Sequence, residues 1–130
     1  MRHNRHGITL IELLVVMVVI GILATIAIPR FMSSREEAFK TRALADLRNL
    51  SSHQEIYWDE DRGYASDIAQ LDIDISRGVS LEITDASGTG WAAQASQSFL
   101  PSMTCGIYYG SADPANGAPA ESAGVVTCSR

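Results

Sequence analysis

Two parts of the sequence contain side chains that could take part in chemistry. The first is an apolar run that contains a single carboxylate. Glu12 is the only ionisable residue in the run Ile8–Ile28, which is 21 residues long. A carboxylate in an apolar span costs free energy, and a positive partner lowers that cost. Because Glu12 lies one helical turn after Ile8, it could also reach a membrane headgroup region unaided. Glu12 is therefore either a tolerated acid near an interface or an acid that requires a positive partner.

The second part is the cysteine pair, Cys105 and Cys128. Two thiolates cannot build a four-thiolate zinc site or an iron–sulfur cluster. The sequence also lacks a C-x-x-C redox motif and a C-x-x-C-H haem motif. In an exported chain, which meets oxidising conditions, we expect the two cysteines to form a disulfide. Two free, buried thiols are the alternative.

Other reactive patterns are weak. Two groups of acids suggest a metal, but neither has the alternating spacing of a calcium loop: Asp59, Glu60 and Asp61; and Asp72, Asp74 and Ser76. His53 is the only histidine outside residues 1–7, and there is no nucleophile elbow, P-loop or zinc-ligand set. We therefore expect no metal site, no cofactor and no enzyme activity. A net charge of −5 and a pI of about 5.0 also give no indication of direct nucleic-acid binding.

The apolar run that holds Glu12 dominates the architecture. As a helix, Ile8–Ile28 would be about 32 Å long, which matches the hydrocarbon thickness of a bilayer. It would be apolar on every face, which excludes a water-facing amphipathic helix. Arg2 and Arg5 precede it without an offsetting acid, so we expect a cytoplasmic N-terminus and an exported remainder. No small-residue cleavage site follows the run, so a signal anchor is the simplest interpretation of this pattern.

The sequence GITLIELLVVMVVIGILATIAIP, residues 7–29, resembles the class III signal of type IV prepilins and the related pseudopilins. The resemblance implies that a prepilin peptidase cuts between Gly7 and Ile8 and that Ile8 is then N-methylated. It implies that Glu12 is the assembly glutamate, which pairs with the Ile8 amine of a neighbouring subunit. It also implies that Gly21 and Pro29 are helix-breaking positions in a filament. Ile8 departs from the commonest residue, Phe, at a position where other apolar residues are tolerated.

After Pro29 the pattern becomes that of an amphipathic helix. A single apolar stripe is formed by Phe39, Ala43, Leu47, Leu50 and Tyr57. Two i,i+4 charge pairs, Glu36–Lys40 and Arg42–Asp46, are expected on the solvated side. A helix from Ile8 to about Glu60, with Gly63 as its C-cap, would be about 80 Å long. Because a 14.0 kDa globule cannot enclose such a rod, we expect its apolar half to project from a small head.

The remainder predicts an antiparallel sheet, so the expected fold class is α+β. A helical turn capped near Ser66 should precede strands at 79–84, 91–96, 103–109 and 125–128, with an irregular surface loop at 110–124. Four aromatic residues are expected in the core or at a subunit interface: Trp91, Phe99, Tyr108 and Tyr109. The expected organisation is a leader (1–7), a membrane or filament-core helix (8–29), its amphipathic half (30–62) and a head with a C-terminal disulfide loop (63–130).

The resemblance implies a structural subunit of a type IV pilus, at first in a bacterial inner membrane and then in an extracellular filament. Its partners would be further copies in a helical homopolymer, the prepilin peptidase, and an inner-membrane assembly machinery with a separate ATPase. The C-terminal disulfide and the lack of a calcium pattern favour a pilin. A pseudopilin of a type II secretion or DNA-uptake system and a signal-anchored binding protein that does not assemble are the alternatives. Motility, adhesion, DNA uptake and conduction are all left open.

Overall fold

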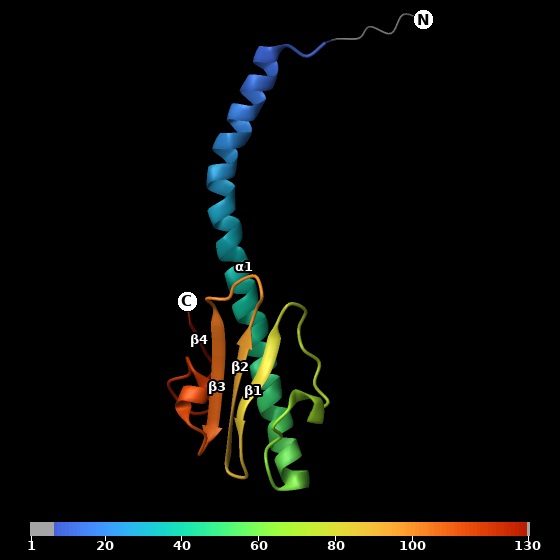
Figure 1. The fold of residues 1–130 in the computed structure, drawn as a ribbon, viewed down its shortest axis with the longest axis vertical. Helices are drawn as coiled ribbons and strands as arrows, with labels where there is room; N and C mark the ends of the chain where they lie inside the picture. Colours follow the sequence, from blue (N-terminus) through green and yellow to red (C-terminus); the bar gives the residue numbers. More distant parts are fainter. Residues whose placement is uncertain (1–6, 130) are drawn as a thin grey trace, which may run out of the picture. The chain divides into compact units, whose positions relative to one another are not determined.

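The computed structural model describes residues 7–129, except for the side chain of Asp61. Its elements are α1 (Leu10–Asp61), the 3-10 turns η1 (Ile68–Gln70) and η2 (Pro114–Gly117), and the strands β1 (Ser80–Ala86), β2 (Gly90–Ser96), β3 (Thr104–Gly110) and β4 (Thr127–Cys128). The strands form one antiparallel sheet in the order β1-β2-β3-β4 (Figure 1). The chain divides after Arg35 into two compact units, here called the N-terminal and C-terminal units. A long helix followed by a small antiparallel sheet confirms the predicted α+β fold.

Helix α1 continues without interruption through Gly21 and Pro29. Pro29 cannot donate a backbone hydrogen bond to the carbonyl group of Thr25. Side-chain hydrogen bonds occur on both sides of this gap: Thr25 Oγ1 donates to the Ile22 carbonyl (2.7 Å) and Ser33 Oγ to the Pro29 carbonyl (3.3 Å). Neither Gly21 nor Pro29 therefore breaks the helix in the isolated chain. The kink at Pro29 and the melting expected in a filament stay predictions.

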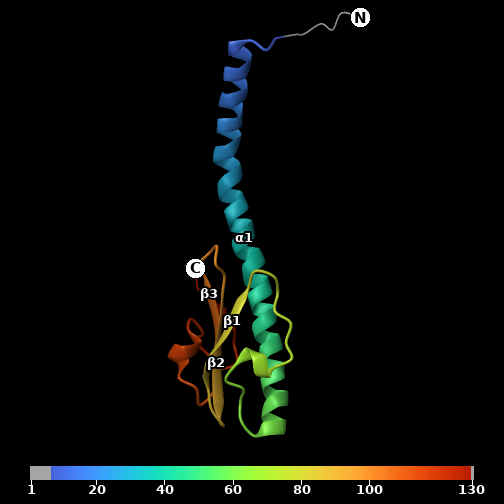
Figure 2. The same cartoon turned by 45° about the vertical axis from the view of Figure 1, so that its right-hand side comes forward.

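The core of the C-terminal unit lies between α1 and one face of the sheet, as Figure 2 shows from a second side. The predicted stripe is confirmed, because Phe39, Ala43, Leu47 and Leu50 are fully buried and Tyr57 packs against them. Alternate residues of β2 and β3 form the opposite side of this core: Trp91, Ala93, Ala95, Cys105 and Ile107. The inward-facing alternate side chains of the strands thus pack against the apolar stripe of α1.

The other face of the sheet is covered by the segment at 110–124, which is the expected irregular surface loop apart from the short turn η2, but which also packs some of its residues against the sheet. Ala112, Gly117 and Ala120 are buried, and Ala92 below them is fully buried. Gln94 Nε2 donates to the Ala118 carbonyl at 3.0 Å. A Cβ atom at Gly106 would lie 2.5 Å from the Ala118 carbonyl oxygen, so glycine is required for this close approach. Small residues on this face leave room for the segment to pack on it.

Cys105 and Cys128 are joined by a disulfide, as expected from the sequence. The two residues face each other in the register of β3 and β4. Strand β4 is only two residues long, Thr127 and Cys128, shorter than the expected 125–128. The disulfide therefore fixes a strand that has few backbone hydrogen bonds, and it closes the segment that covers the second face of the sheet.

The expected solvated pair Arg42–Asp46 is wrong. Asp46 is only 5% exposed, and its carboxylate accepts hydrogen bonds from Ser76 N (3.0 Å) and Ser76 Oγ (2.8 Å). Arg42 Nη1 donates to the Arg77 carbonyl at 2.7 Å. Both side chains tie the segment before β1 to α1, and they do so through partners that are 30 and 35 residues away. Helical periodicity alone could not show these partners.

Several predicted boundaries are wrong by one or two residues. Arg62, with φ of 56°, takes the left-handed position after α1 that was expected for Gly63. The turn expected to be capped near Ser66 is η1, and its cap is the next residue, Asp67, whose carboxylate accepts from Ala69 N at 2.9 Å. Strand β1 extends to Ala86 across an irregularity between Ile83 and Asp85. In each case a local hydrogen bond or strand pairing decides the end of the element.

Gln54 is a buried polar residue that the apolar stripe did not reveal. It is fully buried, four residues after Leu50. Its amide donates to the Ala65 carbonyl (2.9 Å) and accepts from Ala65 N (2.8 Å). These two bonds satisfy the backbone N–H and carbonyl of Ala65 at the point where the chain turns back after α1. Gln54 therefore fixes the position of the segment that leads from the helix to the sheet.

We expect Gln54→Leu to lower the free energy of unfolding by about 2–4 kcal/mol, because it leaves the buried N–H and carbonyl of Ala65 unpaired. The side-chain volume changes little, so a cavity does not explain the loss. Denaturant unfolding of the full chain in mild detergent, monitored by Trp fluorescence, measures the effect. Ser52→Ala, at an exposed position on the same helix, is the control and should change stability by no more than about 0.5 kcal/mol. Equal stability of both variants would contradict this role of Gln54.

Candidate functional site

The predicted processing site lies just before α1. Gly7 and Ile8 are outside the helix, and Ile8 is 79% exposed. The basic residues Arg2 and Arg5 and the rest of the leader 1–6 lie outside the described residues. Because the Gly7–Ile8 peptide bond is exposed and outside the helical hydrogen-bond pattern, nothing in residues 7–129 blocks access to it. Cleavage at this bond and methylation of Ile8 stay predictions.

Glu12 takes part in a reciprocal hydrogen-bonded arrangement with Thr9 at the start of α1. Glu12 N donates to Thr9 Oγ1 at 3.3 Å, and Thr9 N donates to Glu12 Oε2 at 3.3 Å. The Thr9 carbonyl accepts from Leu13 N at 3.2 Å, which makes Thr9 the N-cap and Glu12 the third helical residue. This arrangement is a capping box, in which two backbone N–H groups without helical partners are satisfied by side chains.

The capping box is a function of Glu12 that the sequence interpretation missed. The spacing Thr9-x-x-Glu12 is the sequence signature of this motif and could have revealed it. Thr9 Oγ1 also donates to Glu12 Oε2, at 3.4 Å. Within residues 7–129, the hydrogen bonds to this carboxylate therefore use Oε2 and leave Oε1 available to another donor. Glu12 can stabilise its own helix start and still accept a bond from a second positive group.

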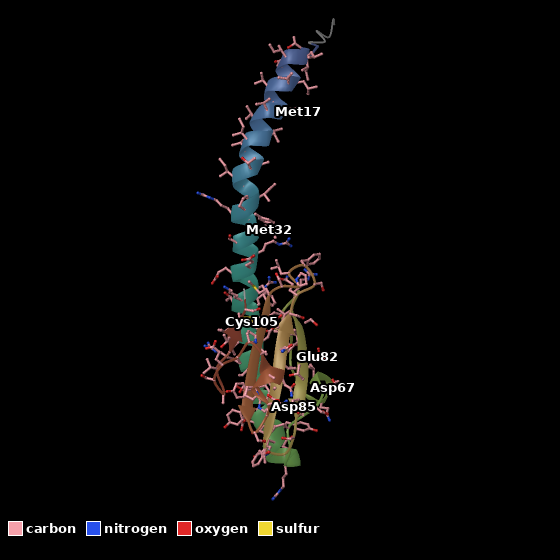
Figure 3. All side chains as sticks on the ribbon, turned by 60° about the vertical axis from the view of Figure 1, so that its left-hand side comes forward. Met17, Met32, Asp67, Glu82, Asp85 and Cys105 are labelled. Atoms are coloured by element: carbon pink, nitrogen blue, oxygen red, sulfur yellow. A yellow bond between two sulfur atoms is a disulfide. The ribbon has the colours of Figure 1, made fainter. Side chains whose placement is uncertain are left out.

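The surface around Glu12 is apolar on all sides. Every large apolar side chain from Ile8 to Phe31 is at least 48% exposed. Figure 3 shows the side chains, Met17 among them, projecting around the whole helix. Exposed patches on soluble monomers are normally a few hundred Å². Helix α1 is long and apolar enough to cross a membrane, by length and composition. The N-terminal unit therefore requires lipid or other protein around it.

The four predicted aromatic residues occupy different environments. Trp91 is fully buried in the core, whereas Phe99 is 75% exposed and Tyr109 is 42% exposed. Tyr64 is not one of these four residues, yet its ring lies 6.5 Å from that of Trp91 and 6.4 Å from that of Tyr109. Burial, followed by the charge of Glu55, raises the pKa of the Tyr64 hydroxyl above its ordinary value. These contacts are structural, because they join the end of α1 to the sheet.

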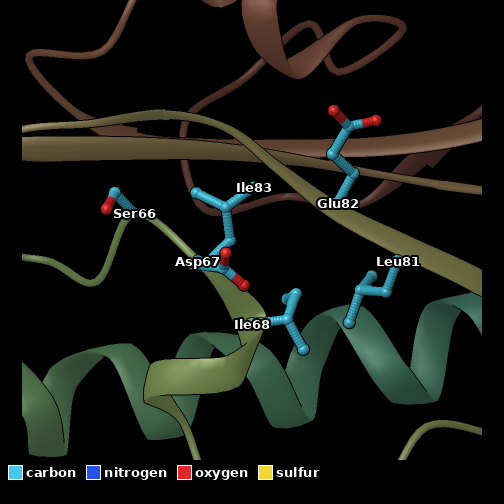
Figure 4. Close-up of a pocket in the computed structure, with 6 residues that line it drawn as sticks. All are labelled: Ser66, Asp67, Ile68, Leu81, Glu82 and Ile83. Atoms are coloured by element: carbon cyan, nitrogen blue, oxygen red, sulfur yellow. The ribbon is translucent and has the colours of Figure 1, made fainter.

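A pocket between η1 and β1 offers no catalytic arrangement. It is lined by Ser66, Asp67, Ile68, Leu81, Glu82 and Ile83 (Figure 4). The carboxylate of Asp67 already caps η1. Among the described residues, no three His, Cys, Asp or Glu side chains come together closely enough to hold a metal ion. Gly7, Ile8 and Glu12 therefore stay the predicted site, and Thr9 joins them through its hydrogen bonds to Glu12.

We expect Thr9→Val, which keeps the shape of the side chain but removes the hydroxyl, to weaken the start of α1 by about 1 kcal/mol. The amides of the first helical turn should then exchange with deuterium about fivefold faster in detergent micelles, because an N-cap bond is lost. Thr9→Ser retains the hydroxyl and is the matched control, with exchange near that of the parent chain. Identical exchange in the Val variant and the parent would show that the capping box contributes nothing.

Comparison with known proteins supports the importance of this N-terminal region. Residues 2–28 match the family described as the prokaryotic N-terminal methylation motif. The chain is 40% identical over 68 residues to the type IV wide pilus major component PilA4 of Thermus thermophilus, with 52% of each chain covered. It is 37% identical over 57 residues to the type II secretion system core protein G of Dickeya chrysanthemi, which covers 44% of this chain and 37% of that protein.

A further relative is the type II secretion system core protein G of Escherichia coli K12, at 37% identity over 54 residues, which cover 42% of this chain and 37% of the relative. The alignments thus span between 37% and 52% of the length of these relatives. The relatives thus include a component of a pilus and core proteins of secretion systems. The N-terminal region of the chain therefore carries a prepilin-type methylation motif, and the chain is similar over about half of its length to a pilus component and to secretion-system core proteins.

Proposed function

We propose that the chain is a structural subunit of a type IV pilus filament, assembled through its N-terminal apolar helix. The observation that carries this proposal is the exposure of every large apolar side chain from Ile8 to Phe31, a stretch that lies mostly within the matched N-terminal methylation motif, residues 2–28. In a membrane-held precursor, lipid would cover this apolar surface. In a filament core, the apolar helices of neighbouring subunits would pack against it instead.

Assembly needs an external source of energy. Moving an apolar helix from lipid into a protein core gains little hydrophobic free energy, since both surroundings are apolar. We therefore propose that an inner-membrane machinery with a separate ATPase extracts the subunit after prepilin peptidase has processed it. The precursor would lie in the bacterial inner membrane and the mature subunit in an extracellular filament.

Glu12 would determine how neighbouring subunits align. Cleavage after Gly7 would give Ile8 a free amine, and this amine is costly to bury alone. Pairing with a carboxylate of a neighbouring subunit lowers that cost, and buried polar pairs can fix the register between helices. The Thr9 capping box holds the Glu12 carboxylate at the helix start, with Oε1 available to the incoming amine.

A second candidate is a pseudopilin of a type II secretion system. It is favoured by the similarity to core protein G from several bacteria at 37% identity or slightly less. The disulfide between Cys105 and Cys128 favours the pilus subunit instead, since many type IV pilins close a C-terminal loop with one disulfide. Deletion of the gene distinguishes them: loss of surface filaments that contain this chain supports a pilin, whereas loss of protein secretion without loss of filaments supports a pseudopilin.

Processing gives the first functional prediction. Mature protein should begin at Ile8 and carry one added methyl group. The loss of Arg2 and Arg5 leaves eight of the ten Lys and Arg residues against fifteen acids, a net charge of −7. Intact-mass analysis of filaments purified from cells measures both changes. Assembled protein that retains residues 1–7 would show that the proposed processing is wrong.

The charge of Glu12 gives the second functional prediction. Glu12→Gln keeps an acceptor for the capping box, because Gln serves at this position, but it removes the carboxylate. We expect stable, membrane-held protein and few or no filaments, because an unpaired buried amine costs about 3–5 kcal/mol in every subunit. Electron microscopy of cells that express only this variant measures filament number.

Glu12→Ala, which removes both the acceptor and the charge, should also abolish filaments while leaving membrane insertion intact or easier. Val19→Ala is the control for a change within the apolar run and should leave filaments in place. Normal filament numbers with Glu12→Gln would show that Glu12 acts only as a helix cap. Failure of either variant to accumulate would contradict the assignment of Glu12 to assembly and would indicate a folding role.

A further inference from the structure

The segment that covers the second face of the sheet contains an asparagine followed by a glycine. Asn116 and Gly117 are the last two residues of η2, and the sequence contains no other Asn-Gly pair. In such a pair the backbone nitrogen of the glycine can attack the side-chain amide of the asparagine, because glycine has no Cβ atom to hinder the approach. An Asn-Gly pair that is free to move is therefore prone to spontaneous deamidation.

Packing makes the glycine of this pair necessary. Gly117 is buried, and a Cβ atom there would lie 2.6 Å from the carbonyl oxygen of Ile107 and 2.8 Å from the Cβ atom of Tyr108. Any larger residue would force the segment away from β3. The fold thus retains a reactive pair at this position, and protection against deamidation has to come from restraint of the asparagine.

Hydrogen bonds restrain both the side chain and the backbone of Asn116, which is half-buried. Its Nδ2 donates to Asp85 Oδ2 at 3.2 Å, its backbone carbonyl accepts from Thr84 Oγ1 at 2.6 Å, and its backbone N–H donates to the Asp113 carbonyl at 3.0 Å. Attack by the Gly117 nitrogen requires the side-chain amide to leave Asp85 and the backbone to leave the 3-10 conformation, since a ring has to close between them. The native contacts therefore oppose the reaction.

The disulfide supports these contacts. Cys105 and Cys128 close the chain around the segment at 110–124, and β4 pairs with β3 at only two positions. Without the covalent link the segment has more conformations available, because loop closure no longer restricts it. It would then open locally more often, and Asn116 would leave Asp85 at each opening.

We propose that Asn116 is a site of spontaneous deamidation whose rate is controlled by the disulfide between Cys105 and Cys128. In the open segment the Gly117 nitrogen gives up its proton to water and bonds to Asn116 Cγ, while Nδ2 leaves as ammonia with a proton taken from water. Water then opens the resulting succinimide ring at either carbonyl group and gives aspartate or isoaspartate at position 116. The net reaction consumes water, releases ammonia and needs no oxidant or reductant.

The product would hinder renewed closure of the segment. It places a carboxylate where the Asn116 amide donates to Asp85, and two carboxylates at this distance repel each other. Isoaspartate also lengthens the backbone by a methylene group. A chain that forms its disulfide early is thus protected, whereas a reduced chain accumulates a change that it cannot reverse. This inference holds for a pilus subunit and for a pseudopilin alike.

The test compares the full chain in mild detergent at slightly alkaline pH in three states: oxidised, reduced, and reduced in urea. Peptide mass spectrometry follows the conversion of Asn116 with time, and Asn49, which precedes Leu50 in α1, is the internal control. We expect conversion of Asn116 to be about tenfold faster in the reduced than in the oxidised chain, because local opening becomes more frequent. Conversion should be fastest in urea, and Asn49 should stay largely unchanged.

Two substitutions at Asp85 test the restraint while the disulfide is intact. Asp85→Ala removes the acceptor of Asn116 Nδ2, and we expect conversion about threefold faster than in the parent chain. Asp85→Asn retains an acceptor oxygen and is the matched control, with conversion near that of the parent. Asn116→Asp, which makes the aspartate product directly, should unfold at a lower urea concentration, and combining it with Asp85→Asn should restore the midpoint.

Several results would overturn the inference. Equal conversion in the oxidised and reduced chains would refute control by the disulfide. Absence of conversion in urea would refute the site itself, and conversion of the oxidised chain as fast as in urea would show that the fold gives no protection. Conversion no faster in Asp85→Ala than in the parent would refute the restraint by Asp85.

Discussion

The unsatisfied apolar surface of the N-terminal half of α1 is the constraint on which the other features of this protein depend. A helix that is apolar on every face cannot be covered by water, so it needs lipid or other helices around it. The same helix changes to a one-sided stripe after Pro29, and this stripe buries Phe39, Ala43, Leu47 and Leu50 beneath the sheet. One continuous helix is therefore suited to two environments. Residues before the change at Pro29 need an apolar environment on every side, whereas residues after it need one only on the side that faces the sheet.

The sheet illustrates how a small unit stabilises both of its faces. One face packs on α1, and the other is covered by the segment at 110–124, which can approach because Ala92 and Gly106 are small. The disulfide between Cys105 and Cys128 holds this segment closed at a strand with only two residues. A short chain gains much from such a covalent link, because its core is limited in size.

Two acids in α1 show how a carboxylate in an apolar setting becomes tolerable. Asp46 is nearly buried and accepts two hydrogen bonds from Ser76. Glu12 accepts from Thr9 at the helix start and retains an oxygen atom that can accept a further bond. Asp46 is therefore satisfied within the fold, whereas Glu12 can combine a local structural role with a contact to another chain. This difference is consistent with the role in assembly that is proposed for Glu12 and not for Asp46.

The sequence determined the features that depend on local pattern: the long helix, its apolar run and stripe, the four antiparallel strands, and Gly7, Ile8 and Glu12 as the candidate site. Periodicity and composition fix these because each is a property of neighbouring residues. Only the tertiary structure decided which polar groups are buried and what covers each face of the sheet. Gln54 pairs with Ala65, Asp46 with Ser76, and residues 110–124 cover the sheet, in each case through contacts between residues far apart in the chain. Such partners are selected by packing, which brings distant residues together without leaving a mark on the local pattern.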